Sequence, residues 1–261
     1  MNAHDVIRYY EQYQEDNRLT RDKSNYVEYL LTFNVVKALI TTNNVKIKLI
    51  DVGCGTGRYS IALSKYCEQI TVCDIVDDSL KILQDKINHL GISNIDILNE
   101  NAMSLNSIQS NEFDIVLCMG PLYHLDKKND RDLCLNEMAR ILKKGGVAVF
   151  SYLSTKALWM NVVKGKMSMK EYLNIHDAAS IPPFYFSSPN KIIKELEKKG
   201  WQIKSHCAVD PISCFFPDII NSLNDDEYNL WLQKVKEKMF TSEYLQLSSH
   251  NILIASLNET T

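Results

Sequence analysis

The stretch Asp51-Val52-Gly53-Cys54-Gly55-Thr56-Gly57 decides how this chain folds, because it follows a short apolar run and precedes a segment with helical periodicity. Glycine adopts backbone angles that other residues avoid, and it lets the backbone approach a bound molecule closely. The first turn of a helix presents unpaired N–H groups and a partial positive charge. In an open parallel sheet, ligands bind in the crevice beyond the carboxyl ends of the strands. We therefore expect a ligand site at this loop.

Outward from the loop, apolar runs alternate with amphipathic segments. Strands are predicted at 47–52, 70–73, 95–98, 113–119 and 147–150, and helices at 58–67, 78–90 and about 130–142. The last of these helices is expected to close at a glycine cap, Gly145-Gly146. Such alternation is typical of βαβ units and predicts an α/β fold with a doubly wound, mostly parallel sheet.

The flanking segments complete this organisation. Helical periodicity covers residues 3–42, and after residue 187 the pattern predicts helices near 188–199 and 225–239 and strands near 202–209 and 251–257. Between the two parts, an insertion rich in methionine and aromatic residues interrupts the alternation. We divide the chain into an N-terminal helical cap (1–44), a ligand-binding core (45–153), the insertion (154–187) and a segment that completes the sheet (188–261). We expect the insertion to be a lid that selects the substrate, the alternative being that it only covers the sheet edge.

Composition narrows the class of protein. The chain has 261 residues, of which 45% are hydrophobic and 23% charged, as in an ordinary globular protein. Its formal net charge of −3 argues against nucleic acid as a partner. The seven cysteines form no CxxC pair, which favours free thiols in the cytoplasm over disulfides or a zinc site. No apolar run reaches the roughly 18 residues of a membrane span, and no acidic cluster predicts a metal site.

Two details indicate which ligand the loop takes. The glycine spacing is GxGxG, whereas dinucleotide binders use GxGxxG. Asp51 would repel a pyrophosphate but would accept from an ammonium group, and Asp74, placed 17 residues after Gly57, is positioned to accept from ribose hydroxyls. S-adenosylmethionine (SAM) has both groups and no phosphate. The alternatives are a purely structural glycine turn and a dinucleotide-dependent oxidoreductase.

These features resemble a known family. Leu49–Tyr59 resembles the first motif of class I SAM-dependent methyltransferases, and Asp74 matches their ribose-binding acidic residue. Phe113–Val116 resembles their fourth-strand motif, and Leu142–Gly146 resembles the turn into their fifth strand. The resemblance spans about 45–153 and is strongest to small-molecule enzymes such as those of quinone biosynthesis. It implies a Rossmann-like sheet of seven strands, with the last strand antiparallel between the fifth and sixth.

The resemblance also implies individual contacts. The methionine part of SAM would lie along the loop, Asp74 would bind the ribose, and Ile75 would pack on the adenine. Met119 would form the floor near the sulfonium. The loop residues implied in these contacts are Gly53, Cys54, Gly55 and Gly57.

Two further regions of the chain are expected to contribute to the site. Asn101-Ala102 occupy the place where an acidic residue usually holds the adenine amino group, and an amide oxygen accepts there with weaker charge assistance. Near the N-terminus, Tyr13 and Arg18 are our candidates for binding the carboxylate of SAM. The alternative for this region is an amphipathic helix that simply packs on the sheet.

The tip of the fourth predicted strand is where the acceptor would react. DNA-amine methyltransferases carry an Asn/Asp-Pro-Pro-Tyr motif there, but Gly120 stands in its first position and has no side chain to hold an amine. His124 is either a general base or a residue that fixes the turn, and Tyr123 is either a proton carrier or a wall.

The sequence therefore predicts an enzyme that transfers a methyl group from SAM to a small molecule by in-line displacement, releasing S-adenosylhomocysteine (SAH). Such an enzyme must align the nucleophile with the methyl group and exclude water. The rival from another class is a non-catalytic SAM-binding module. The sequence leaves open whether oxygen, nitrogen, carbon or sulfur accepts the methyl group.

Overall fold

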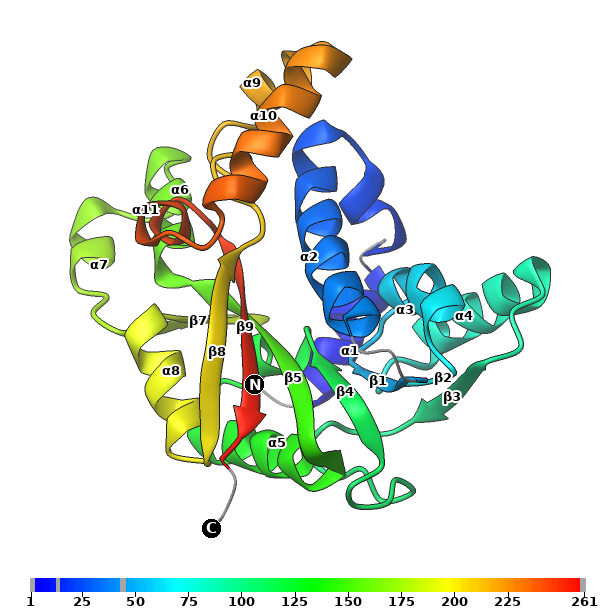
Figure 1. The fold of residues 1–261 in the computed structure, drawn as a ribbon. Coiled ribbons are helices and arrows are strands. Elements are labelled where there is room, and N and C mark those ends of the chain that lie inside the picture. Colours follow the sequence, from blue (N-terminus) through cyan, green and yellow to red (C-terminus); the bar gives the residue numbers. More distant parts are fainter. Residues whose placement is uncertain (1–2, 13–14, 43–45, 259–261) are drawn as a thin grey trace.

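A computed structural model describes residues 3–12, 15–42 and 46–258 of the chain (Figure 1). The N-terminal region consists of α1 (Ala3–Gln12), the short 3-10 helix η1 (Glu15–Thr20) and α2 (Lys23–Thr41). The next elements, up to the insertion, are β1 (Lys48–Val52), α3 (Arg58–Leu63), η2 (Ser64–Tyr66), β2 (Gln69–Asp74), α4 (Asp77–Leu90), β3 (Ile95–Asn99), β4 (Phe113–Cys118), η3 (Pro121–Tyr123), α5 (Lys128–Ile141) and β5 (Leu142–Ser154). After the insertion come α8 (Pro189–Glu197), β8 (Trp201–Ala208), α9 (Pro217–Ser222), α10 (Asp225–Lys238), α11 (Ser242–Gln246) and β9 (His250–Leu257).

The central sheet has the strand order β3-β2-β1-β4-β5-β9-β8. Neighbours from β3 to β5 pair in parallel, while β9 runs antiparallel to both β5 and β8. The register of β9 against β5 runs from Ala148 opposite Ala255 to Leu153 opposite His250. The predicted seven-stranded order, with the last strand antiparallel between the fifth and sixth, is confirmed.

The insertion contains more structure than its sequence indicated. It folds as η4 (Thr155–Leu158), α6 (Trp159–Val163), α7 (Met169–Leu173) and a hairpin of β6 (Ala178–Ile181) and β7 (Phe184–Ser187). β7 pairs in parallel with the end of β5, so the hairpin extends the sheet to nine strands. The two prolines at 182–183 masked this hairpin in the sequence, because proline is rare inside strands and here it occupies the turn.

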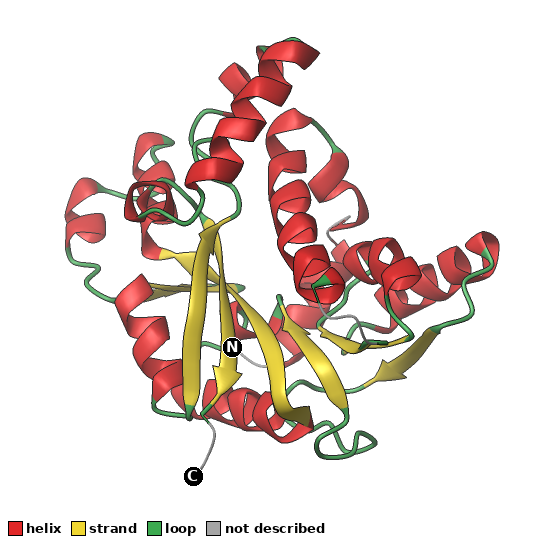
Figure 2. Cartoon of the chain, viewed as in Figure 1, coloured by secondary structure: helices red, strands yellow, loops and turns green. Residues whose placement is uncertain are grey.

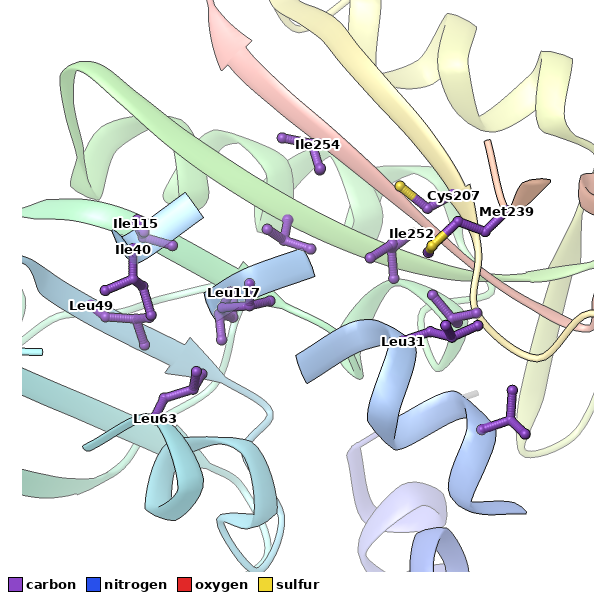
Figure 3. Packing of buried hydrophobic residues seen from close by; sticks show 14 of the residues in the cluster. Leu31, Ile40, Leu49, Leu63, Ile115, Leu117, Cys207, Met239, Ile252 and Ile254 are labelled. Carbon is purple, nitrogen blue, oxygen red and sulfur yellow. The ribbon is translucent and has the colours of Figure 1, made fainter. Parts of the chain in front are cut away.

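Helices cover both faces of the sheet (Figure 2). Successive strand residues point to opposite faces, so Leu49 and Ile115 join one hydrophobic cluster whereas Ile50 and Val116 join the other. Figure 3 shows the first cluster, where side chains from β1, β4 and β9 meet Leu31 and Ile40 of α2. The second cluster packs α5 and α8 against the other face.

Helix α5 ends differently from the prediction. It stops at Ile141, and Leu142 is already extended, so the predicted glycine cap at Gly145-Gly146 is wrong. The amides of Asn111 and Glu112 donate to the carbonyls of Arg140 and Ile141, at 2.9 Å each. Because tertiary contacts satisfy these carbonyls, the helix needs no glycine there.

Among the described residues, no helix is long and apolar enough to cross a membrane.

Candidate active site

A cavity of about 330 Å³ lies at the carboxyl ends of β1, β2 and β4, where the glycine loop predicted a ligand. The predicted site residues that line it are Arg18, Asp51, Gly53, Cys54, Gly55, Asp74, Ile75, Asn101, Ala102, Met119, Tyr123 and His124. Tyr13 lies outside the described residues. The fold therefore brings together residues from five separate segments of the sequence.

Of the three loop glycines, Gly53 and Gly57 are required by close packing, whereas Gly55 faces open space. A Cβ at Gly53 would lie 2.7 Å from Cδ of Pro121, and one at Gly57 would overlap the side chain of Leu83. Both glycines are therefore needed for packing within the protein. Gly55 has a φ of +54°, and a Cβ there would meet no atom within 4 Å. Gly55 thus opens toward the cavity, whereas Gly57 is not among the residues that line it, and a contact of Gly57 with the ligand stays a prediction.

Asp74 is held by the backbone of the site. Its Oδ2 accepts from the amide of Gly55 at 2.8 Å, and its Oδ1 accepts from the amide of Val76 at 3.0 Å. Burial raises the pKa of Asp74 despite these hydrogen bonds, which favour the ionised form. A carboxylate offers about four lone-pair directions, so two backbone bonds leave acceptor capacity for a ligand.

Asp51 is a buried carboxyl group in the wall of the same cavity. Its side chain accepts from Oγ of Ser60 at 2.5 Å, and the residue is only 2% exposed. Burial, reinforced by the negative charge of Asp74, raises the pKa of Asp51 to about 6. A cationic group in the cavity would favour the ionised form and reverse this shift.

At the predicted adenine end, Asn101 and the residue before it have different hydrogen bonds. The Oδ1 atom of Asn101 accepts from the amide of Met103 at 3.0 Å, so this oxygen is committed to a local turn. The preceding residue, Glu100, also lines the cavity, and its Oε1 accepts from the amide of Ser107 at 2.9 Å. Its Oε2 is buried and has no hydrogen-bond partner among the described residues. Glu100 is not among the residues predicted from the sequence, because the family resemblance points to position 101.

Arg18 lies in the cavity wall as part of an ion pair. Its guanidinium donates to both oxygens of Glu28, at 2.7 and 3.1 Å. Glu28 also lines the cavity, and Nδ1 of His250 lies 3.6 Å from its carboxylate. No sequence pattern indicates that Glu28 and His250 meet, since the two residues are distant in the chain.

His124 has both ring nitrogens engaged. Nε2 lies 2.9 Å from the hydroxyl of Tyr10, and Nδ1 lies 2.8 Å from the carbonyl oxygen of Pro183 in the β6–β7 turn. A carbonyl only accepts, so Nδ1 carries the proton and Nε2 accepts from Tyr10. Burial lowers the pKa of His124 to about 4, which keeps the ring neutral. This arrangement favours the turn-fixing interpretation of His124 over the general base.

Tyr123 packs by its ring rather than standing alone in the cavity. Its ring centre lies 4.8 Å from that of His124 and 6.1 Å from that of His250, both edge to face. These contacts favour the interpretation of Tyr123 as a wall of the site.

Together, the strand order, the glycine loop after β1 and the carboxylate after β2 define the fold of class I methyltransferases. Residues 50–150 match the family described as the methyltransferase domain. Among solved structures, a S-adenosylmethionine-dependent methyltransferase from Clostridium acetobutylicum ATCC 824 is similar, with a TM-score of 0.60 and 14% identity over 87% of this chain and 90% of that one. Magnesium protoporphyrin IX methyltransferase from Synechocystis PCC 6803, solved with SAH bound, has a TM-score of 0.59 and 16% identity over 89% and 84%. The chain therefore shares the fold of these methyltransferases, and residues 50–150 are the part that is similar to the family model.

Curated relatives point to the same group. Demethylmenaquinone methyltransferase of Staphylococcus carnosus (strain TM300) is 36% identical over 105 residues, which are 39% of this chain and 41% of the relative. Ubiquinone biosynthesis O-methyltransferase of Xanthomonas oryzae pv. oryzae (strain PXO99A) is 30% identical over 168 residues, 64% of each chain. The chain thus matches about two fifths of the length of the first relative and under two thirds of the second.

Proposed function

We propose that this chain is an enzyme that uses SAM to methylate a small molecule by in-line displacement. One observation carries the proposal: a single cavity presents Asp74 and Glu100 near the loop after β2 and β3, and Asp51 and Arg18 near the glycine loop and the N-terminal helices. The first pair suits the hydroxyl and amino groups of adenosine. The second pair suits the ammonium and carboxylate groups of an amino acid.

The residues present fit SAM on physical grounds. A buried carboxylate oxygen without a partner, such as Oε2 of Glu100, is costly unless a ligand donates to it. Asp51 is buried, has no cationic partner within the described part of the chain and has a raised pKa, so an ammonium group would stabilise its ionised form. Gly55 leaves open space at the loop.

The protein groups then have defined roles. Bound SAM supplies a methyl group whose leaving group is a neutral thioether. Asp74 accepts from the ribose, Asp51 binds the ammonium group, and Arg18 binds the carboxylate. Met119 and Tyr123 form walls that orient the acceptor and exclude water. Such positioning contributes effective molarities on the order of 10⁵ M or more.

The insertion is proposed to be the lid of this site. The carbonyl of Pro183 meets His124, and the ring of Phe184 packs 5.3 Å from the ring of His124 and 5.6 Å from that of Tyr9 in α1. The hairpin and α1 thus meet over the tip of β4. This aromatic surrounding supports a planar or apolar acceptor, and quinols related to those in the relatives' names are the first acceptors to test. We also propose a cytoplasmic location, which the seven free thiols support.

Binding and turnover test the proposal separately. Calorimetry of the purified chain should show SAH binding, and Asp74→Asn and Gly55→Val should each weaken it. Turnover is then followed as transfer of labelled methyl groups from SAM to a panel of reduced quinols, phenols and amines. Unchanged SAH affinity in both variants would overturn the assigned site. Binding without turnover of any acceptor would favour the non-catalytic module, and NAD binding without SAH binding would favour an oxidoreductase.

A further inference from the structure

Behind Arg18 lies a chain of alternating charges that runs from the cavity into the protein. Arg18 of η1 donates to Glu28 of α2, and the Nδ1 atom of His250, the first residue of β9, lies 3.6 Å from Glu28. The same Nδ1 atom lies 3.5 Å from Oδ2 of Asp210, in the segment after β8. Only Arg18 and Glu28 line the cavity. The four side chains are 9% to 22% exposed, so water screens their interactions weakly.

The inner end of this chain is fixed in place. Oδ1 of Asp210 accepts from the amides of Ser249 and His250 at 2.8 Å each and from Oγ of Ser248 at 2.5 Å. Three donors on one oxygen hold the carboxylate in a single orientation. Its second oxygen therefore stays directed at the imidazole of His250.

His250 is placed between two carboxylates. Burial by itself lowers the pKa of His250, but the charges of Glu28 and Asp210 outweigh burial and raise this pKa above its usual value. Arg18 opposes this rise, and the ring of Tyr123 lies edge to face with that of His250, with ring centres 6.1 Å apart. The protonated imidazole thus interacts with the same carboxylate that Arg18 uses.

The protonation state of His250 therefore changes the electrostatic environment around Arg18 at the cavity wall. When His250 is protonated, the net charge of Arg18, Glu28, His250 and Asp210 is zero. When His250 is neutral, their net charge is −1, and Arg18 is then the positive charge within this group of four that compensates Glu28. A carboxylate approaching Arg18 would then meet a more negative wall. We propose that His250, anchored by Asp210, is a positioning residue that keeps Glu28 from neutralising Arg18, so that Arg18 binds the carboxylate of the amino-acid tail of SAM.

The inference rests on the proposed function, and a comparison of two ligands distinguishes a failure of the inference from a failure of that function. SAH carries the amino-acid tail, whereas 5′-methylthioadenosine has the same nucleoside and sulfur without it. Calorimetry should show that His250→Gln weakens SAH binding on the order of tenfold, as expected for one unit charge acting over roughly 10 Å at an effective dielectric of about 20. The affinity for 5′-methylthioadenosine should stay the same. If neither ligand binds the unaltered protein, the proposed function fails before the inference is tested.

His206→Gln is the matched control. His206 is also a buried histidine, on the neighbouring strand β8, but its Nε2 pairs with the hydroxyl of Tyr152 at 2.9 Å and it does not line the cavity. This variant should leave the ratio of the two affinities unchanged. If the role of His250 were only structural, His250→Gln would weaken the binding of both ligands equally, and that result would overturn the inference.

A double-mutant cycle tests whether His250 acts through Arg18. Arg18→Gln should itself weaken SAH but not 5′-methylthioadenosine, and adding His250→Gln should then have little further effect. An equal loss from His250→Gln with and without Arg18 would overturn the inference.

The pH profile gives an independent readout. The preference for SAH over 5′-methylthioadenosine should rise as Asp51 ionises near pH 6 and fall at higher pH as His250 loses its proton. In His250→Gln the upper limb should disappear or move to the pH at which the ligand's own ammonium group titrates. An upper limb unchanged by the substitution would contradict the proposed role.

Discussion

Alanine at Gly57 should mainly lower stability, whereas alanine at Gly55 should mainly weaken ligand binding. Both glycines have left-handed φ values, +76° and +54°, so each substitution carries a backbone cost of roughly 1–2 kcal/mol. At Gly57 the new methyl group also overlaps Leu83, a fully buried residue of α4. Overpacking of this kind adds typically 1–3 kcal/mol. Gly57→Ala should therefore lower the free energy of unfolding by about 2–5 kcal/mol, and Gly55→Ala by about 1–2 kcal/mol.

Urea unfolding and SAH calorimetry check both halves of this prediction. Gly57→Ala should show the lower urea midpoint at similar slope, while its folded form binds SAH within about twofold of the parent, because residue 57 does not line the cavity. Gly55→Ala should weaken SAH binding with the smaller loss of stability. Leu83→Ala should cost less in the Gly57→Ala background than in the parent, since it removes the overlap. Equal urea midpoints for the two glycine variants, or additive effects of Gly57→Ala and Leu83→Ala, would refute the packing argument.

Three further predictions concern ionisable groups in the interior. Glu100→Gln should lower SAH affinity about fivefold by calorimetry, because an amide oxygen lacks the charge assistance of a carboxylate, whereas Asn101→Ala should lower it by less. The folded-state pKa of His124, about 4, lies below its usual 6.5, so the folded protein binds fewer protons in this window and stability is lost as pH falls from 6.5 towards 4. His124→Gln should therefore reduce the loss of unfolding free energy between pH 7 and pH 4.5 by on the order of 2 kcal/mol, and an unchanged loss would contradict the assignment. Glu195→Gln should cost about 3–5 kcal/mol in urea unfolding, because Glu195 accepts twice, at 2.9 Å, from the buried Arg131; Lys191→Gln, which breaks only a half-exposed pair with Glu195, should cost under about 1 kcal/mol.

The fold was predictable where the pattern is local. Apolar runs followed by glycine or a helical repeat predicted the bounds of β1 to β4 within one residue, whereas β5 begins five residues earlier and ends four residues later than predicted. The antiparallel β9 came from the family resemblance, since no single-strand pattern specifies pairing direction. The short helices α9 and α11 and the β6–β7 hairpin were missed. Each of these two helices has six residues or fewer, too short for a helical periodicity to show, and the hairpin was hidden by the two prolines of its turn.

The site was predictable where residues follow strand ends. Asp51, Asp74 and Met119 each lie at or just after the end of a strand, so topology alone brings them to one edge of the sheet. Glu28, His250 and Asp210 carry no such mark, because they meet only through the packing of α2 against the last two strands. His124 lines the same cavity, and its neutral state depends on Tyr10 and Pro183, which come from distant segments.

The carboxyl groups that line the cavity are in an electrostatically unfavourable environment, and this bears on what the protein binds. Burial raises the pKa values of Asp51 and Asp74, and a buried oxygen of Glu100 has no partner among the described residues. Each of these costs folding free energy at neutral pH, since a buried carboxylate is unfavourable without donors or a cation. A neutral, apolar ligand would leave all three costs in place. A molecule with hydroxyl donors, an amino donor and an ammonium group would offset all three at once, and a ligand that binds only the folded state stabilises it by that same interaction. The arrangement of these carboxyl groups thus selects a nucleoside carrying an amino-acid tail more strongly than the glycine loop alone does.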